Sequence, residues 1–257
     1  MATETDAISL VRALRASHDR LSGLVAGLGG AELHQQSYDT EWSIADVLSH
    51  LGSGAEIFAL VIDAGATGGA PPAQESFQQI WDAWNARSPE DQAADAIAAD
   101  AALVSKIESL TPEQRAAFSV AMFGPAPFDL TRVLSMRLSE HALHTWDIAV
   151  ALDPGARVAP DAVELLIDQL PVLVGFLGKQ APAPVAVAVA TTAPKRAFIL
   201  DTGVVSLVPD GAAPATASLD LPAEAFVRLI SGRLADAAEL TASGVTLLEL
   251  KSVFPGF

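Results

Sequence analysis

The stretch Arg137-Leu-Ser-Glu140-His141-Ala-Leu-His144-Thr-Trp-Asp147 determines how the N-terminal part of the chain is interpreted. It holds good helix formers and neither Gly nor Pro, so it predicts a helix. Glu140 and His144 are four residues apart, which places their side chains about one turn apart on the same helix face. A carboxylate and an imidazole at this spacing can bind one metal ion from a single helix.

A third ligand has to come from another part of the chain, and His50 is the best donor. It lies in the segment Trp42-Ser-Ile-Ala-Asp-Val-Leu-Ser-His50-Leu. This segment has a helix start signal, because Ser43 and Asp46 have the spacing of a capping box. Two histidines and one glutamate suit zinc and leave at least one coordination position open for chemistry.

Spacing alone leaves other interpretations open. His141 and His144 are three residues apart, so His50, His141 and His144 form a second compatible ligand set. A Glu/His pair on a helix is also common on solvated surface, and short motifs have many false positives. His18 falls on the apolar face of a helix predicted from about Thr5 to Leu28. We interpret it as a hydrogen-bonded core residue that, if near the metal, would support a ligand.

The two segments together resemble the metal-binding domain of the mycothiol-dependent maleylpyruvate isomerases, within the wider superfamily of DinB-like four-helix bundles. The matching residues are Trp42-Ser43-x-x-Asp46-Val47-Leu48-x-His50-Leu51 and Arg137-x-x-Glu140-x-x-x-His144-x-x-Asp147. By position, the resemblance implies that His50, Glu140 and His144 bind Zn²⁺ or another divalent metal. It extends over nearly the whole chain, and its motifs are specific for the superfamily rather than for a substrate.

The resemblance also implies a reaction. In that family mycothiol adds through its sulfur to the cis double bond of maleylpyruvate. Rotation about the resulting single bond and expulsion of the thiolate then give the trans isomer, fumarylpyruvate. A coordinating thiol loses its proton, and the thiolate is the reactive nucleophile.

Arginines are the expected ligands of the substrate's carboxylates, because guanidinium groups bind carboxylates through two parallel hydrogen bonds. In the family an arginine of the second domain closes over the active site, and Arg233 is the best positional match. Arg137, three residues before Glu140, is the second candidate, and Arg228 lies with Arg233 in the C-terminal segment Phe226-Val-Arg-Leu-Ile-Ser-Gly-Arg. For each, the alternative is an ordinary surface arginine. Asp147 is expected either to orient the imidazole of His144 or to be a capping or solvated residue.

Charge and cysteine content exclude several classes of function. The formal net charge is -16, from 31 acidic and 15 basic residues, which argues against non-specific nucleic-acid binding and requires local arginines for an anionic substrate. The chain has no cysteine, so disulfides, a cysteine nucleophile and cysteine-containing zinc sites are excluded. A reactive sulfur therefore has to arrive on a cofactor.

The patterns along the chain predict an α+β protein with two domains. Residues 1–153 are expected to form a DinB-like metal-binding bundle of four helices, and residues 154–257 a smaller sheet-and-helix domain. The breaker Asp153-Pro154-Gly155 marks the boundary. Beyond it we expect a helix at 161–177 with a kink or break at Pro171, and a helix at 223–230. Short strands are expected between them at 185–189, 197–200, 204–208 and 215–219.

The N-terminal sequence is acidic and lacks the basic start and apolar core of a signal peptide, and no uninterrupted apolar run has the length of a membrane span. We therefore expect a soluble, cytoplasmic protein. Its expected partners are a small thiol and a small anionic or electrophilic substrate, with neither nucleic acid nor membrane. The oligomeric state stays open.

Three functions are compatible with these features. The first is the metal- and mycothiol-dependent isomerisation of maleylpyruvate or a related substrate. The second is transfer of mycothiol or another small thiol to an electrophile by the same site, as an S-transferase. The third is a non-catalytic protein whose second domain binds a lipid or another small molecule.

Overall fold

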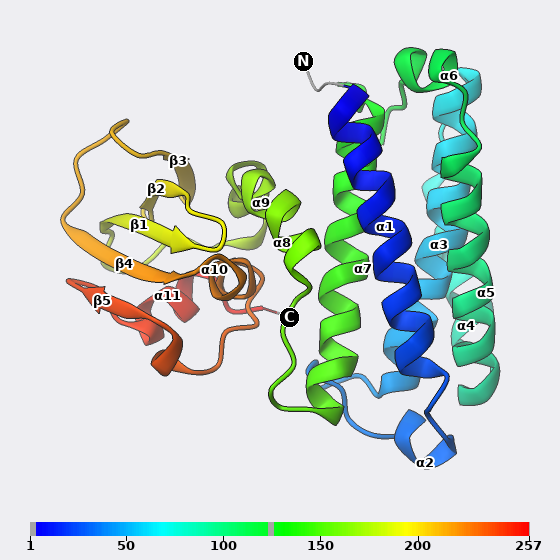
Figure 1. The fold of residues 1–257 in the computed structure, drawn as a ribbon, viewed down its shortest axis with the longest axis horizontal. Helices are drawn as coiled ribbons and strands as arrows, with labels where there is room; N and C mark the ends of the chain where they lie inside the picture. Colours follow the sequence, from blue (N-terminus) through cyan, green and yellow to red (C-terminus); the bar gives the residue numbers. More distant parts are fainter. Residues whose placement is uncertain (1–3, 123–125, 257) are drawn as a thin grey trace. The chain divides into compact units, whose positions relative to one another are not determined.

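The computed structural model describes residues 4–122 and 126–256, and it confirms the α+β class (Figure 1). The chain divides into two compact units, Met1–Arg157 and Val158–Phe257. The division comes shortly after the predicted boundary at 153, because Asp153 ends the last long helix and the segment up to Arg157 still packs on the first unit. The indole of Trp146, for example, donates to the carbonyl of Ala156 at 3.0 Å.

The first unit is built around the four longest helices among the described residues. Helix α1 packs against α5 and α7, and α3 packs against the same two helices, so the four close into a bundle (Figure 1). The long helices are α1 (Glu4–Val25), α3 (Ile44–Thr67), α5 (Pro89–Glu108) and α7 (Leu130–Leu152). Shorter helices lie between them: α2 (Gly30–Leu33), α4 (Gln74–Asn85) and α6 (Pro112–Ala117).

Local capping signals fix where three of the long helices begin. Ser43 and Asp46 form the expected reciprocal capping box at the start of α3. Ser88 caps α5, with Pro89 in the first turn, and the carboxylate of Asp129 accepts a hydrogen bond from a backbone N–H at the start of α7. These caps set the register of each helix and therefore the face that each side chain occupies.

Helix α3 is the most apolar of the bundle. It is long and apolar enough to span a membrane, but 61% of its most apolar window is buried inside the bundle, as in the core helix of a globular protein. Close packing requires a glycine here, because a Cβ at Gly52 would overlap the ring of Trp84, which is itself buried. This contact fixes α4 against α3 near the turn that carries His50.

The second unit combines a mixed sheet with helices. The strand order is β3-β2-β1-β4-β5, and all neighbouring pairs are antiparallel except the parallel pair β1 and β4. The strands are β1 (Ala186–Thr192), β2 (Ala197–Asp201), β3 (Ser206–Pro209), β4 (Ala217–Pro222) and β5 (Thr241–Ser243). The helices are α8 (Pro160–Leu166), α9 (Leu170–Leu177), α10 (Ala223–Ile230) and α11 (Leu247–Val253), with 3-10 turns at Ile167–Gln169 and Ala237–Glu239.

The break expected in the helix at 161–177 is present: a 3-10 turn separates α8 from α9 just before Pro171, which lies in the first turn of α9. Other details differ from the sequence-based expectations. Strand β5 and helix α11 were not predicted. Gly124, Pro125 and Pro127 predict an irregular connection over residues 122–128, and part of it, 123–125, lies outside the described residues.

Candidate metal centre

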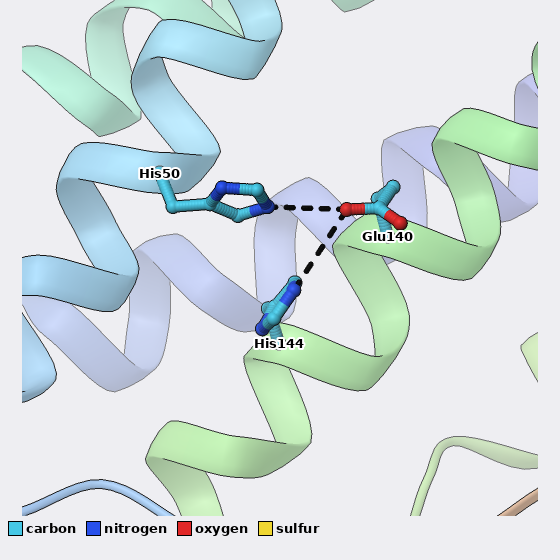
Figure 2. Close-up of side chains that lie close together, drawn as sticks. All are labelled: His50, Glu140 and His144. Carbon is cyan, nitrogen blue, oxygen red and sulfur yellow. Dashed lines mark hydrogen bonds and ion pairs between the residues drawn. The ribbon is translucent and has the colours of Figure 1, made fainter. Parts of the chain in front are cut away.

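The three residues expected to bind metal come together where α3 meets α7 (Figure 2). His50 extends from α3, and Glu140 and His144 extend from successive turns of α7. Nε2 of His50 lies 3.1 Å from Oε2 of Glu140, and Nε2 of His144 lies 3.8 Å from the same oxygen. The donor atoms of the three residues all lie within 4.8 Å of one another.

These separations fit a single metal ion. A zinc ion about 2.1 Å from each ligand in a tetrahedral arrangement holds its ligand atoms about 3.4 Å apart. The two separations from Oε2 of Glu140, 3.1 and 3.8 Å, bracket that value, so a small adjustment of the side chains suffices to place an ion between them. Two imidazoles and one carboxylate are a donor set that suits zinc.

The cluster is accessible from one side. The side chain of His144 is 8% exposed, whereas those of His50 and Glu140 are 33% and 47% exposed. Trp42 lies over the imidazoles, with its ring centroid 5.1 Å from that of His50 and 6.0 Å from that of His144. Three protein ligands with an accessible side leave room for a further ligand at a bound metal.

The electrostatics of the cluster keep the carboxylate ionised. Packing of the helices around Glu140 raises its pKa, but the hydrogen bond from His50 and the charges of His144, His50 and Arg137 outweigh that effect and lower the pKa to about 2. Glu140 therefore presents a negative charge to a cation at neutral pH.

Asp147 lies behind His144 on α7. Its Oδ2 is 2.9 Å from Nδ1 of His144, while Nε2 of the same ring faces Glu140. Asp147 is fully buried, and its backbone carbonyl accepts a hydrogen bond from the N–H of Tyr38. A carboxylate at Nδ1 leaves Nε2 as the metal-facing nitrogen and orients the ring.

The structure places His18 and His141 in a second cluster inside the bundle, away from the three candidate ligands. Oδ2 of Asp100, on α5, lies 2.9 Å from Nδ1 of His18 and 3.0 Å from Nε2 of His141. Nδ1 of His141 is 2.8 Å from the hydroxyl of Ser17. Both nitrogens of His141 thus face groups of this inner cluster, which favours Glu140 over His141 as the ligand. His18 has the hydrogen-bonded core position expected for it.

Arg137 belongs to the same inner cluster. Its side chain is 2% exposed, and Nη2 donates to Oδ1 of Asp100 at 2.8 Å and to the carbonyl of Leu51 at 3.1 Å. Burial raises the pKa of Asp100, but His141, His18 and Arg137 outweigh it and hold that pKa well below its ordinary range. Burial lowers the pKa of His141. The placement of Arg137 favours internal support over direct contact with substrate.

The arginines predicted in the second unit are also buried. Arg228 pairs with Glu224 at 2.7 Å and with Glu239 at 2.7 Å, so its guanidinium is held between two carboxylates. Arg233 is 5% exposed, and its Nη1 donates to the carbonyl of Ser231 at 3.0 Å. The role of Arg233 in binding substrate stays a prediction.

Sequence reasoning missed Asp100, although the signal was present. Ala93, Ala96, Leu103 and Ile107 are buried on one face of α5, and Asp100 falls at the same three- and four-residue steps. An acidic residue inside an apolar stripe needs buried partners, and it therefore predicts a polar cluster in the core.

Comparisons with known proteins identify a family and a similar fold. The family model of the mycothiol maleylpyruvate isomerase N-terminal domain matches residues 14–149, just over half of the chain. The crystal structure of the mycothiol-dependent maleylpyruvate isomerase has a similar fold, with a TM-score of 0.69 and 14% sequence identity over 95% of this chain and 96% of that one. A histidine-to-alanine mutant of the mycothiol-dependent maleylpyruvate isomerase has the same TM-score at 13% identity, over the same shares of the two chains. No match was found among curated proteins. Because the matched segment spans more than half of the chain and contains all three residues of the cluster, the protein belongs to the mycothiol maleylpyruvate isomerase N-terminal domain family.

Proposed function

We propose that this protein is a metal-dependent enzyme that uses mycothiol as a thiol cofactor and isomerises maleylpyruvate, or a related cis-alkene, to the trans product. The observation that carries the proposal is the convergence of His50, Glu140 and His144 within 4.8 Å on the accessible side of the bundle. Zn²⁺ is the proposed metal because it prefers this mixture of nitrogen and oxygen ligands. A cytoplasmic location suits this use, because small thiols stay reduced there.

Each residue of the site has a separate task. His50, Glu140 and His144 hold the ion, and the ionised Glu140 lowers the net charge of the loaded site. Asp147 holds the His144 ring with Nε2 towards the ion. When bound, the metal keeps a thiol in its thiolate form near neutral pH, and the thiol supplies the nucleophile that this cysteine-free chain lacks.

The substrate's carboxylates need a cation, since the chain carries a net charge of -16. We assign this task to Arg233, the best positional match to the second-domain arginine that closes over the active site in the family. Arg137 was the other candidate, but its guanidinium is already bonded to Asp100. A buried guanidinium that is released to a dicarboxylate would bind it through two parallel hydrogen bonds.

Metal content of the purified protein is the first test. We expect about one zinc per chain, lost in Glu140→Ala and His144→Ala and retained in His34→Ala, which replaces an exposed histidine outside the cluster. Circular dichroism should show that all three variants are folded. Zinc that stays bound in Glu140→Ala and His144→Ala would reject the ligand set.

Activity assays then separate the candidate reactions. With mycothiol and maleylpyruvate, the isomerase predicts thiol-dependent formation of fumarylpyruvate without net consumption of the thiol. An S-transferase would instead consume mycothiol and an electrophile in equal amounts, with the same metal requirement. Protein that takes up no zinc and copurifies with lipid would favour the non-catalytic binding function and overturn the proposal.

A further inference from the structure

A connected set of polar side chains crosses the middle of the bundle beside the candidate metal centre. Asp100 of α5 is 1% exposed, and it contacts His18 of α1 together with Arg137 and His141 of α7. Through Arg137 the set also reaches α3, at the carbonyl of Leu51. Three of the long helices therefore meet at one buried carboxylate, and the fourth, α3, is connected to it through Arg137.

Arg137 connects this set to the metal centre. Its Nη2 is shared between Asp100 and the carbonyl of Leu51, the residue that follows His50. The guanidinium lies close against α3, because a Cβ at Gly54 would approach Nη1 to 3.0 Å. Arg137 therefore joins the turn of α3 that carries one ligand to the helix that carries Glu140, one turn further along α7.

A second connection holds the other side of the same turn of α7. His141 directly follows Glu140 in sequence, and its imidazole lies between Asp100 on α5 and the hydroxyl of Ser17 on α1. The backbone that carries Glu140 is thus fixed by contacts on its inner face, while the carboxylate itself points to the accessible side. The rotation of α7 about its own axis depends on these contacts.

We propose that Asp100 is a positioning residue for the metal centre, which acts through Arg137 and His141 to hold α3 and α7 at the separation that lets His50 and Glu140 bind one ion. This inference rests on the proposed function only in taking the bound ion to be zinc. Without Asp100, the guanidinium of Arg137 loses its carboxylate partner in the core and has to move towards water, and the contact with Leu51 goes with it.

The test compares variants that keep the shape of the core. Asp100→Asn removes the charge but leaves Arg137 unpaired, so a second variant, Asp100→Asn with Arg137→Met, removes both charges and guards against unfolding. Asp95→Asn is the matched control, because Asp95 lies on the exposed face of α5 and pairs with Arg87. Zinc affinity is measured by competition with a chromophoric chelator, and Co²⁺-substituted protein reports the ligand geometry by its visible spectrum.

For the Asp100 variants we expect one zinc per chain bound roughly 10- to 100-fold more weakly than in wild type, with an altered Co²⁺ spectrum, because residues that support a ligand typically contribute that factor. Asp95→Asn should match wild type in both measurements. Unchanged affinity and an unchanged spectrum in the folded double variant would overturn the positioning role and leave the proposed function intact.

A wild-type protein that binds no zinc would reject the proposed function instead. The positioning role is then decided by NMR of the metal-free protein. A shift of the His50 ring resonances in the double variant, absent in Asp95→Asn, would support it, and ring resonances that stay in place would overturn it.

Discussion

Replacing Asp147 with Asn tests whether the carboxylate of Asp147 orients the imidazole of His144, one of the three proposed metal ligands. The substitution preserves the size of the side chain and an oxygen that can face Nδ1 of His144, but it removes the negative charge. In the wild-type structure the two groups are 2.9 Å apart, and Asp147 is fully buried. The change therefore acts at short range in a water-poor environment, while all three ligands of the proposed ion stay in place.

The expected magnitude follows from this geometry. The carboxylate raises the basicity of the ring and keeps Nε2, the nitrogen that faces Glu140, free for the metal. Losing such support typically weakens metal binding by about 10- to 100-fold. This corresponds to about 1.4–2.8 kcal/mol of binding free energy. The effect should be much smaller than the loss of a ligand in His144→Ala.

Chelator competition at constant pH measures this change. Asp153→Asn is a suitable control, because Asp153 is exposed at the C-terminal end of the same helix. We expect weaker zinc binding in Asp147→Asn alone, with the stoichiometry still at about one per chain. Zinc affinity within about twofold of wild type, a difference of roughly 0.4 kcal/mol, would refute the orienting role of Asp147.

Three further predictions concern turnover, packing and pH. Arg233→Ala should lower kcat/KM by roughly tenfold or more with zinc retained, since a hydrogen bond to a charged group contributes about 1.5–3 kcal/mol. Steady-state kinetics together with metal analysis measures this change. Full activity of the variant would show that Arg233 has no part in the mechanism. Gly52→Ala should destabilise the protein by about 1–3 kcal/mol, because the new methyl group overlaps Trp84. In the control Gly23→Ala the new methyl group meets no atom within 4 Å, and Ala favours the helix, so this variant should be more stable by up to about 1 kcal/mol. Urea unfolding measures both changes. Asp100 has a lower pKa folded than unfolded, so its stabilising effect is complete above the unfolded value of about 3.9 and is lost as the pH falls through the folded value. Asp100→Asn should therefore be less stable at neutral pH and show a flatter acid dependence of unfolding free energy, and parallel pH curves would contradict this assignment.

Local sequence signals predicted only part of the candidate metal centre. Glu140 and His144 are neighbours by helix geometry alone, and the capping box at Ser43 sets the register that turns His50 towards α7. The spacing of residues within each motif could not predict that α3 packs against α7. This pairing came from the resemblance of two whole motifs, and spacing alone left His141 open as a ligand.

The missed features depend on tertiary contacts or on very short segments. The position of Asp100 in the apolar stripe of α5 was a readable signal, but its partners His18, Arg137 and His141 lie on other helices, and only tertiary packing brings them together. Strand β5 has three residues and depends on its pairing with β4. Helix α11 did have a readable signal, because Thr246 and Glu249 form a capping box.

The buried carboxylate at the centre of the bundle also constrains how this protein can change over evolutionary time. Loss of Asp100 alone leaves the guanidinium of Arg137 buried without its carboxylate partner, and loss of Arg137 alone removes the positive charge that faces Asp100. Breaking a buried ion pair from either side costs about 3–5 kcal/mol, a large fraction of the stability of a typical domain. Single substitutions at either position are therefore strongly disfavoured, whereas a paired replacement leaves neither charge buried alone and should cost less stability. Relatives of this protein should carry both residues or neither, and intermediates with only one should be rare.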